Sequence, residues 1–328
     1  MKRIRKNVSL FICVALFSVF ALGSGSSDEK PNAEKVGEVS QSSASESDKD
    51  TNSVSSTAKE EVKEAYYVGD TFSNKGLNVS LVSTKYYISD NEFIQPTEGN
   101  QYIQLCFHVD NQSGSDKSVT VYDFNCYADG YECANAYFDD DLSASLSTGR
   151  SSDGAVYFEV PEGASEIEIE YEYDMFNNKK VKFVFEGDKE SKLVFEKNTE
   201  ANENAFHVGD IIETKYVRIS YNKAAEFVSD NMFIQPKEGY RYIYIELEAE
   251  NISDSDQTIS YFSFGCYADG SSCDGFYGMD DNLSATMSAG RKAKGTIAYE
   301  VPVDAKTIEI EYEDNLWTQD KIIFLYEE

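Results

Sequence analysis

The residues best suited to chemistry are two pairs of cysteines that lie in nearly identical stretches. CYADGYEC spans residues 126–133, and CYADGSSC spans residues 266–273. Each pair could bind a metal, act as a redox centre, form a disulfide or stay as buried free thiols. Zinc sites use four ligands with about two to four residues between neighbouring cysteines, and redox centres favour Cys-x-x-Cys. Here six residues lie between the two cysteines of each pair and no histidine is nearby, so a metal or redox site is disfavoured.

The Asp-Gly between the paired cysteines favours a disulfide. Asp-Gly is a strong signal for a tight hairpin turn, which sets the two flanking arms side by side. Cysteines that face each other across such a hairpin come within disulfide reach. Closing so short a loop stabilises the fold by roughly 2–2.5 kcal/mol on the chain-entropy model. We predict the disulfides Cys126–Cys133 and Cys266–Cys273, with buried free thiols as the alternative.

Cys106 has no cysteine counterpart, because Glu246 occupies the aligned position. We expect Cys106 on the outward face of a strand. An exposed thiol there could link two copies of the chain through an intermolecular disulfide. The alternative is a single thiol that is partly buried under a loop.

Catalytic constellations are weak in this sequence. The two histidines, His108 and His207, align with Glu248 and Tyr67, and neither lies near a Ser or Cys motif that suggests a triad. Glutamates are so abundant that any two could be placed for glycoside hydrolysis, which removes the signal. A phosphate-binding glycine-rich loop is also missing from the sequence. We predict a protein that is not an enzyme and uses no cofactor, with a carboxylate-dependent glycoside hydrolase as the alternative.

Acidic loops are weak candidates for Ca²⁺ binding. Clustered carboxylates can hold this ion, but the EF-hand order and its closing Glu are missing, so we favour solvated loops and predict no metal. The candidate ligands are Asp139, Asp140, Asp141, Asp280 and Asp281.

Tyrosines in and beside the cysteine hairpins are candidates for ligand binding. Repeated tyrosines on a stapled hairpin could form a small recognition tip for a glycan or peptide. Packing against the edge of a sheet is the alternative. The four residues are Tyr127, Tyr137, Tyr267 and Tyr277.

These candidates lie in two copies of one sequence. SDNEFIQPTEGNQYI (89–103) matches SDNMFIQPKEGYRYI (229–243), and DDLSASLSTGR (140–150) matches DNLSATMSAGR (281–291). Two long matched copies indicate a tandem repeat of one structural unit. We predict domains over residues 65–197 and 204–328.

Each copy has the pattern of β-structure. Residues 103–109 and 167–173 alternate apolar and polar side chains, which indicates strands with one face on a core. Turn signals recur between such runs, and 23 Tyr and 20 Phe against 5 Pro suit β-rich domains. About seven or eight short strands in roughly 125 residues predict a β-sandwich. Residues 180–186 and 192–197 predict a hairpin whose second arm is found in the first copy only, and this added arm is either an extra edge strand or an ordered spacer between the domains.

Several short motifs together resemble a known family. They are Tyr-x-Val-Gly-Asp at the start of the first copy, Pro-x-x-Gly before a long strand, Glu-Asn-x-Ser-x-Ser-Asp after it (Glu250 to Asp256), the Asp-Gly hairpin, the Ala-Gly-Arg turn and Glu-Val-Pro at a strand end. The resemblance is to an exported bacterial domain of unknown function, common in Gram-positive lipoproteins. That family is assigned an immunoglobulin-like β-sandwich and is grouped with immunoprotective extracellular antigens. The resemblance implies no catalytic residues.

The N-terminus predicts export. Residues 1–23 combine a basic start, an apolar stretch and small residues near Gly23, as in a signal peptide. The flanking sequence resembles a lipoprotein signal, but Ser24 stands where the lipidated Cys would be, and Cys13 lies too deep to replace it. An uncleaved anchor is the alternative. Residues 24–64, Ser-rich, acidic and without aromatic residues, predict a disordered linker.

The charge of the chain limits its partners. Lys and Arg number 29 against 59 Asp and Glu, a formal net charge of −30, which would repel DNA, RNA and anionic lipid. We expect membrane contact only through the N-terminal signal or anchor. We therefore predict a secreted or cell-surface binding or scaffold protein whose partner is an envelope protein, peptide or glycan, with a purely structural spacer as a further alternative.

Overall fold

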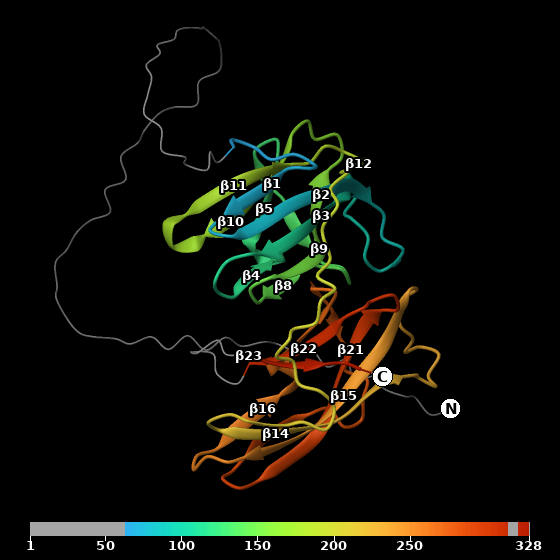
Figure 1. Ribbon diagram of the computed structural model, residues 1–328. Helices are drawn as coiled ribbons and strands as arrows, with labels where there is room; N and C mark the ends of the chain where they lie inside the picture. The colour runs from blue at the N-terminus through green and yellow to red at the C-terminus, as the bar shows by residue number, and fades with distance from the viewer. Residues whose placement is uncertain (1–62, 314–320, 328) are drawn as a thin grey trace, which may run out of the picture. The chain divides into compact units, whose positions relative to one another are not determined.

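The computed structural model describes residues 63–313 and 321–327, and nearly every regular element in them is a β-strand (Figure 1). The helical elements of this part of the chain are single 3-10 turns, Val121–Asp123 (η1), Met175–Asn177 (η2) and Tyr261–Ser263 (η3). Within the same residues no helix is long and apolar enough to cross a bilayer. The predicted signal peptide, residues 1–23, and all but the last two residues of the predicted linker, 24–64, lie outside the described residues.

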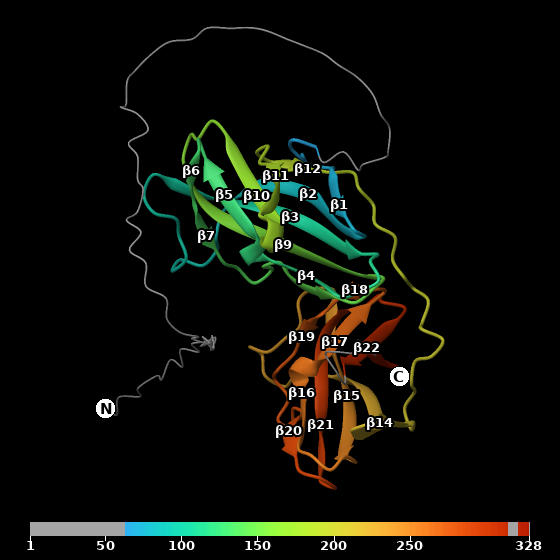
Figure 2. The ribbon, with the colours of Figure 1, turned by 90° about the vertical axis from the view of Figure 1, so that its left-hand side faces the viewer.

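The first repeat is built from two sheets that face each other (Figures 1 and 2). One has the order β1-β2-β3-β9 and the other β11-β10-β5-β6, and β4 pairs with β8 separately. The short strands β7 and β12 pair with β9 and β2. The bounds are β1 Thr71–Asn74, β2 Leu77–Tyr87, β3 Asn100–Asn111, β4 Lys117–Thr120, β5 Phe124–Ala128, β6 Tyr131–Glu132, β7 Ala134–Ala136, β8 Ser143–Leu146, β9 Arg150–Pro161, β10 Ile167–Asp174, β11 Lys179–Val184 and β12 Lys189–Glu190.

The second repeat follows the same plan. One of its sheets has the order β13-β14-β15-β21-β19, and β16 pairs with β20. The other face is β18-β17-β22-β23, which continues the β1-β2-β3-β9 sheet of the first repeat through the pairing of β18 with β9. Even the irregularity recurs, because β2 shifts register between Leu81 and Ser83 and β14 shifts between Tyr221 and Lys223. The bounds are β13 Ile211–Glu213, β14 Val217–Phe227, β15 Tyr240–Asn251, β16 Gln257–Ser260, β17 Phe264–Ala268, β18 Ser271–Ser272, β19 Asp274–Gly275, β20 Ser284–Met287, β21 Lys292–Pro302, β22 Ile308–Glu313 and β23 Lys321–Leu325.

Aromatic rings fill the space between the two sheets of the first repeat. Phe107 on β3 packs against Phe124 on β5, with ring centroids 4.9 Å apart, and against Phe183 on β11 at 5.0 Å. Phe124 also stacks on Tyr171 of β10 at 4.8 Å. These side chains occupy the apolar positions of the alternating pattern, so the alternation places them on the inner faces. The predicted all-β class and tandem β-sandwich are therefore confirmed.

The predicted hairpin over residues 180–197 is wrong in its second arm. The open edge of β11 is already occupied by Tyr66, whose N–H donates to Lys182 O at 2.8 Å and whose carbonyl accepts from Val184 N at 2.9 Å. The returning chain pairs with β2 instead, through Lys189 opposite Thr84. Residues beyond β12 then run as an ordered connection to the second repeat, and the Phe195 ring stacks on His108 at 3.7 Å.

Candidate functional site

The cysteine stretches form the predicted hairpins. Strand β5 pairs with β6 and β17 pairs with β18, and each turn has both residues of its Asp-Gly in the left-handed region that a tight hairpin needs, with φ of 49° and 81° in the first copy. Cys133 N donates to Cys126 O at 2.9 Å, and Cys273 N donates to Cys266 O at the same distance. The partners of each pair therefore face each other.

The structure describes these cysteines as thiols whose side chains interact within each pair. Burial raises the pKa of Cys126 far above its usual range, and the neighbouring Cys133 raises it further. Burial likewise raises the pKa of Cys266. A high thiol pKa keeps the thiolate scarce, which argues against a nucleophile or a metal ligand. The disulfides Cys126–Cys133 and Cys266–Cys273 stay predictions that the paired backbones accommodate.

Cys106 is half-buried on the outer face of β3. Its neighbours on that face, Gln104 and His108, are buried because the loop around Phe138 and the connection at Phe195 cover them. Burial raises the pKa of the Cys106 thiol. A dimer linked through Cys106 remains a prediction.

The four candidate tyrosines do not share one environment. Tyr267 is 4% exposed and lies in a contact between the two repeats, which contradicts its expected place in a recognition tip. Tyr127 is half-buried on the corresponding face of the first repeat. Tyr137 and Tyr277 are exposed, and each sits beside a second exposed aromatic ring, Tyr122 at 6.2 Å and Phe262 at 6.1 Å. Each repeat therefore has a pair of exposed aromatic rings at this position.

Three of the five candidate Ca²⁺ ligands, Asp140, Asp141 and Asp281, have hydrogen-bond partners in the protein. Among residues 63–313 and 321–327 no three His, Cys, Asp or Glu side chains come together as a metal site. Asp140 accepts from Tyr157 Oη at 2.6 Å, Asp141 from Phe138 N at 3.0 Å, and Asp281 from Thr296 Oγ1 at 2.9 Å. These bonds tie the acidic loops to β9 and β21.

The histidines lack the partners of a catalytic triad. His108 Nδ1 lies 2.8 Å from Asp153 Oδ1, and Ser80 is its neighbour across the strands. The Ser80 hydroxyl bonds instead to Thr71 Oγ1 at 2.8 Å, and within the described chain no hydrogen bond joins it to His108. His207 Nδ1 lies 2.9 Å from Glu327 on the surface, and this hydrogen bond raises the pKa of the imidazole.

Highly exposed apolar side chains gather on one loop that both repeats share. Phe93 is 88% exposed and its counterpart Phe233 is 87% exposed. Aliphatic neighbours add to each loop, and they too are highly exposed: Ile88 in the first repeat, and Val228 and Met232 in the second. Large apolar side chains are thus exposed to solvent at matched positions of the two repeats.

Side-chain hydrogen bonds hold this loop in one shape. In the first repeat Asn91 Oδ1 accepts from Phe93 N at 3.0 Å, while Gln95 Nε2 donates to Ser89 O at 3.1 Å and Asn91 O at 2.8 Å. The second repeat makes the same three bonds with the same distances, through its own Asn, Gln and Ser: Asn231, Gln235 and Ser229. The fully shared SDNxFIQP motif encodes this scaffold, and the exposed Phe is part of the motif.

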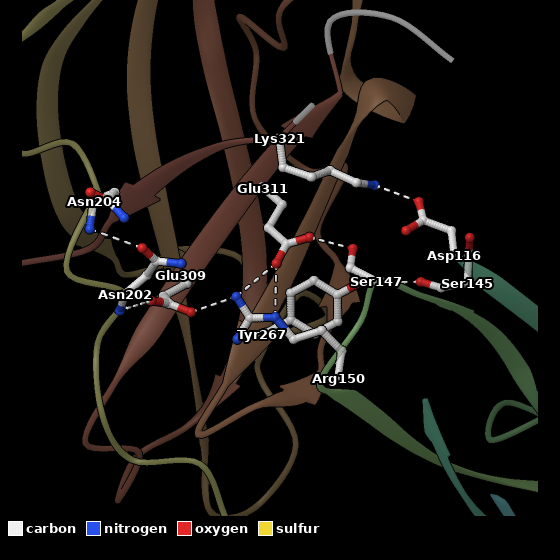
Figure 3. A network of polar contacts seen from close by, with 10 residues as sticks. All are labelled: Asp116, Ser145, Ser147, Arg150, Asn202, Asn204, Tyr267, Glu309, Glu311 and Lys321. Carbon is white, nitrogen blue, oxygen red and sulfur yellow. Dashed lines mark hydrogen bonds and ion pairs between the residues drawn. The ribbon is translucent and has the colours of Figure 1, made fainter. Parts of the chain in front are cut away.

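A buried ion-pair network joins the two repeats (Figure 3). Arg150 starts β9 and reaches two carboxylates on the outer face of β22. Its Nη2 lies 2.5 Å from Glu309 Oε2 and 2.7 Å from Glu311 Oε1, and its Nε donates to Glu311 Oε1 at 2.8 Å. The side chains of Arg150, Glu309 and Glu311 are only 8%, 3% and 6% exposed.

Tyr267 and neighbouring polar groups complete this contact. The Arg150 guanidinium lies over the Tyr267 ring, 4.6 Å from its centroid, in a cation–π arrangement. The Tyr267 hydroxyl donates to Ser145 O at 3.1 Å, and Ser147 Oγ donates to Glu311 at 2.5 Å. Burial by itself would lower the pKa of Arg150, but the adjacent carboxylates outweigh it and the pKa is raised.

The contact extends along the connecting segment. Ser151 N donates to Gly270 O at 3.0 Å, which bridges β9 to β18 (Figure 2). Asn202 N donates to Glu309 at 2.6 Å, and Lys321 Nζ lies 2.8 Å from Asp116. Glu309 and Glu311 are not among the candidate residues that the sequence predicts. The signal that could have found them is the change from Lys182 in the first copy to Ile323 in the second, which removes a cation from this face.

Comparisons with known proteins agree with the duplicated fold. Residues 66–181 and 206–322 each match the family described as "Domain of unknown function (DUF4352)". No curated protein matches the chain.

Solved structures with related folds come from several bacteria. The lipoprotein candidate YcdA of Bacillus subtilis shows 18% identity and a TM-score of 0.30, covering 36% of this chain and 38% of its own. This chain therefore spans 38% of the length of that relative. The secreted protein MPT63 of Mycobacterium tuberculosis shows 16% identity and a TM-score of 0.29, covering 37% and 95%. An uncharacterised β-sandwich protein of Clostridium difficile shows 13% identity and a TM-score of 0.27, covering 40% and 100%.

Proposed function

The chain belongs to the DUF4352 family, in two tandem copies, and on that premise we propose that it is an exported, non-enzymatic protein that binds a partner in the cell envelope through two matched loops. These loops are residues 88–95 and 228–235, named here the Phe93 loop and the Phe233 loop. One observation carries the proposal: both present an almost fully exposed Phe on the same hydrogen-bonded scaffold.

The scaffold favours binding because it lowers the entropy lost on association. A loop that is already held in its bound shape loses little conformational freedom when a partner docks. The exposure of the Phe93 and Phe233 rings to water is unfavourable in free energy, and this penalty is removed only when a partner covers them. Solvent exposure of both rings therefore supports a binding role.

The chemistry of the loops favours a protein partner. Each loop combines an aromatic ring with aliphatic side chains, Ile88 in the first and Val228 and Met232 in the second. Such a set fits an apolar pocket on a protein, whereas glycans need many polar contacts beside a flat ring. The net charge of −30 favours a partner face that is neutral or basic.

Two loops on one chain predict avidity. If both engage the same envelope surface, the second contact becomes intramolecular and raises the apparent affinity by about 10²-fold or more. The test is retention of the secreted chain on isolated bacterial envelopes, compared with envelopes stripped of protein by protease. We expect Phe93→Ser or Phe233→Ser to weaken retention by about 10²-fold and the double variant to abolish it.

Phe176 provides the matched control, because it is 93% exposed but lies in η2, outside the shared motif. Phe176→Ser should be retained like the unaltered chain. Equal retention of the double variant and the unaltered chain would refute the proposal, and so would undiminished retention on protease-treated envelopes.

A spacer role is the second candidate, and the buried Arg150 network favours it. A charge network with paired partners fixes one arrangement more than it adds stability. A pure spacer predicts that removing both Phe side chains leaves envelope retention unchanged, while shortening the chain by one repeat changes only the distance that it spans. The retention experiment therefore separates the two candidates.

A further inference from the structure

The turn that carries Arg150 has an exact backbone copy in the second repeat. Gly149 N donates to Asn111 O at 2.6 Å, and Gly290 N donates to Asn251 O at 2.9 Å. Both glycines adopt positive φ, 79° and 70°, which the turn requires. The sequence Ser-x-Gly-Arg therefore presents Ser288 and Arg291 as it presents Ser147 and Arg150.

The second turn has no receptor within the described chain. Ser147 and Arg150 are buried in the contact with the second repeat, whereas Ser288 and Arg291 are exposed. No ion pair to Arg291 occurs among residues 63–313 and 321–327. The second repeat therefore presents its own Ser-x-Gly-Arg turn, which is exposed to solvent.

The first repeat has the matching receptor face. In the second repeat Tyr267 lies opposite Glu309 in the pairing of β17 with β22, and in the first repeat Tyr127 lies opposite Glu168 in the pairing of β5 with β10. Glu170 follows two residues later, as Glu311 does. The Tyr–Glu–x–Glu set that receives Arg150 is thus repeated on a face that carries no partner domain.

Several substitutions distinguish this open face from the occupied one, among them Tyr131 in place of Ser271, whose hydroxyl lies 3.1 Å from that of Ser151 in the occupied contact. Lys182 replaces Ile323 and lies 2.9 Å from Glu168, so that it partly neutralises the carboxylate that would receive an arginine. Asn125 replaces Gly265, beside which the Tyr267 ring lies. Both Lys182 and Glu168 are solvent-accessible, at 43% and 27%, and surface pairs of this kind contribute about 0–1 kcal/mol. Lys182 therefore lowers the affinity of this face for an arginine but does not block the site.

We infer that the Arg291 turn of one copy docks on the Tyr127–Glu168–Glu170 face of a second copy. Arg291 would lie against Glu168 and Glu170, and Asp256 would meet Lys180, as Asp116 meets Lys321 within the chain. The contact joins the Arg291 turn of one copy to the Tyr127–Glu168–Glu170 face of another. The first copy therefore keeps its own face free, and the second copy keeps its own turn free. Repetition of such a head-to-tail contact gives open chains of molecules rather than closed dimers.

The same observations make the contact between copies weaker than the contact within one copy. The connecting segment holds Arg150 next to Glu309 and Glu311 at a high effective concentration, and the second copy lacks that advantage. Lys182 adds competition for Glu168. The assembly should therefore form at high local concentration, as on a crowded surface, and dissolve as salt screens the ion pairs.

Sedimentation velocity over a range of concentrations tests this inference, with Cys106→Ser in every variant so that no disulfide-linked dimer interferes. The reference chain should associate as its concentration rises, and Arg291→Ala should stay monomeric. Lys182→Ile, which restores the residue of the occupied face, should tighten association by up to about fivefold.

Mixing two variants that each lack one surface gives the sharper result. Arg291→Ala and Glu168→Gln/Glu170→Gln should each be monomeric alone. Their mixture has one intact turn and one intact face per pair, so it should form dimers and nothing longer. The inference is overturned if Lys182→Ile stays monomeric at every concentration, if Arg291→Ala associates like the reference, or if the mixture stays monomeric while circular dichroism shows both variants folded.

Discussion

The two Ser-x-Gly-Arg turns have matching backbone hydrogen bonds, but their arginines have different environments. Arg150 is buried against Glu309 and Glu311, and Arg291 is exposed. The turns themselves do not explain this difference, because their backbone hydrogen bonds match. The receiving faces differ in charge: on the first repeat Lys182 pairs with Glu168 and Lys180 with Glu170, whereas on the second repeat Ile323 takes the place of Lys182 and both glutamates receive Arg150. The charge of the receiving face therefore distinguishes the two copies.

Replacing Arg150 should have the largest effect on this asymmetry. Arg150→Ala would leave Glu309 and Glu311 buried without a cation, a cost of about 3–5 kcal/mol that separation of the two repeats would relieve. We therefore expect calorimetry to show one coupled unfolding transition for the unaltered chain and two separate transitions for Arg150→Ala.

Arg291→Ala is the matched control for that experiment. Its side chain is exposed, so the change in unfolding free energy at low protein concentration should stay within about 0.5 kcal/mol. Equal effects of the two substitutions would contradict the difference between the turns.

Loss of a disulfide should have the next largest effect. Under oxidising conditions Cys133→Ser and Cys273→Ser should each lower the free energy of unfolding by roughly 2–2.5 kcal/mol, because each opens one short covalent loop. The intact mass of the unaltered chain should rise by four hydrogens on reduction. If the mass does not change, both pairs are thiols and the substitutions should have little effect.

Moving the lysine between the repeats should have a smaller effect. Ile323→Lys gives the second repeat the cation that the first repeat has, and it should pair with Glu309 and compete with Arg150. We expect the coupling between the two unfolding transitions to fall by about 1 kcal/mol, the upper range of a surface ion pair. Ile323→Met, which keeps the charge unchanged, should leave the coupling intact, and an equal loss in both variants would point to packing instead.

The smallest effect concerns His207, which stands where the first repeat has Tyr67. The hydrogen bond to Glu327 raises the pKa of His207 above the ordinary 6.5. The resulting stabilisation is present below pH 6.5 and is lost as pH rises through the raised folded pKa. Proton NMR should show a midpoint above 6.5 that returns towards it in Glu327→Gln. An unchanged midpoint would exclude this pair as the cause.

The fold was predictable because its signals are local. Alternation of apolar residues around Phe107 and Tyr171 defines strand faces, and the Asp129-Gly130 turn defines a hairpin. The failed hairpin at residues 180–197 shows the limit, since the edge of β11 is taken by Tyr66, a residue more than a hundred positions earlier in the chain. Nothing in the local pattern reveals that competition.

The candidate site was less predictable because it depends on contacts between repeats. Tyr267 looked like an exposed counterpart of Tyr127, and only docking of Arg150 buries it. Glu309 and Glu311 read as outward carboxylates on an alternating strand, and they are outward with respect to their own sandwich. The Phe93 loop could have been found from sequence, because the shared motif retains an apolar residue that no strand pattern requires.

Arg150 is committed to a contact within the chain, whereas Arg291 is exposed to solvent. Labelling the folded protein at low concentration with an arginine-selective dicarbonyl reagent, followed by peptide mass analysis, tests this directly. We predict rapid modification of Arg291 and strong protection of Arg150, with the protection lost in a Glu309→Gln/Glu311→Gln variant. Equal labelling of Arg150 and Arg291 in the unaltered chain would contradict the account.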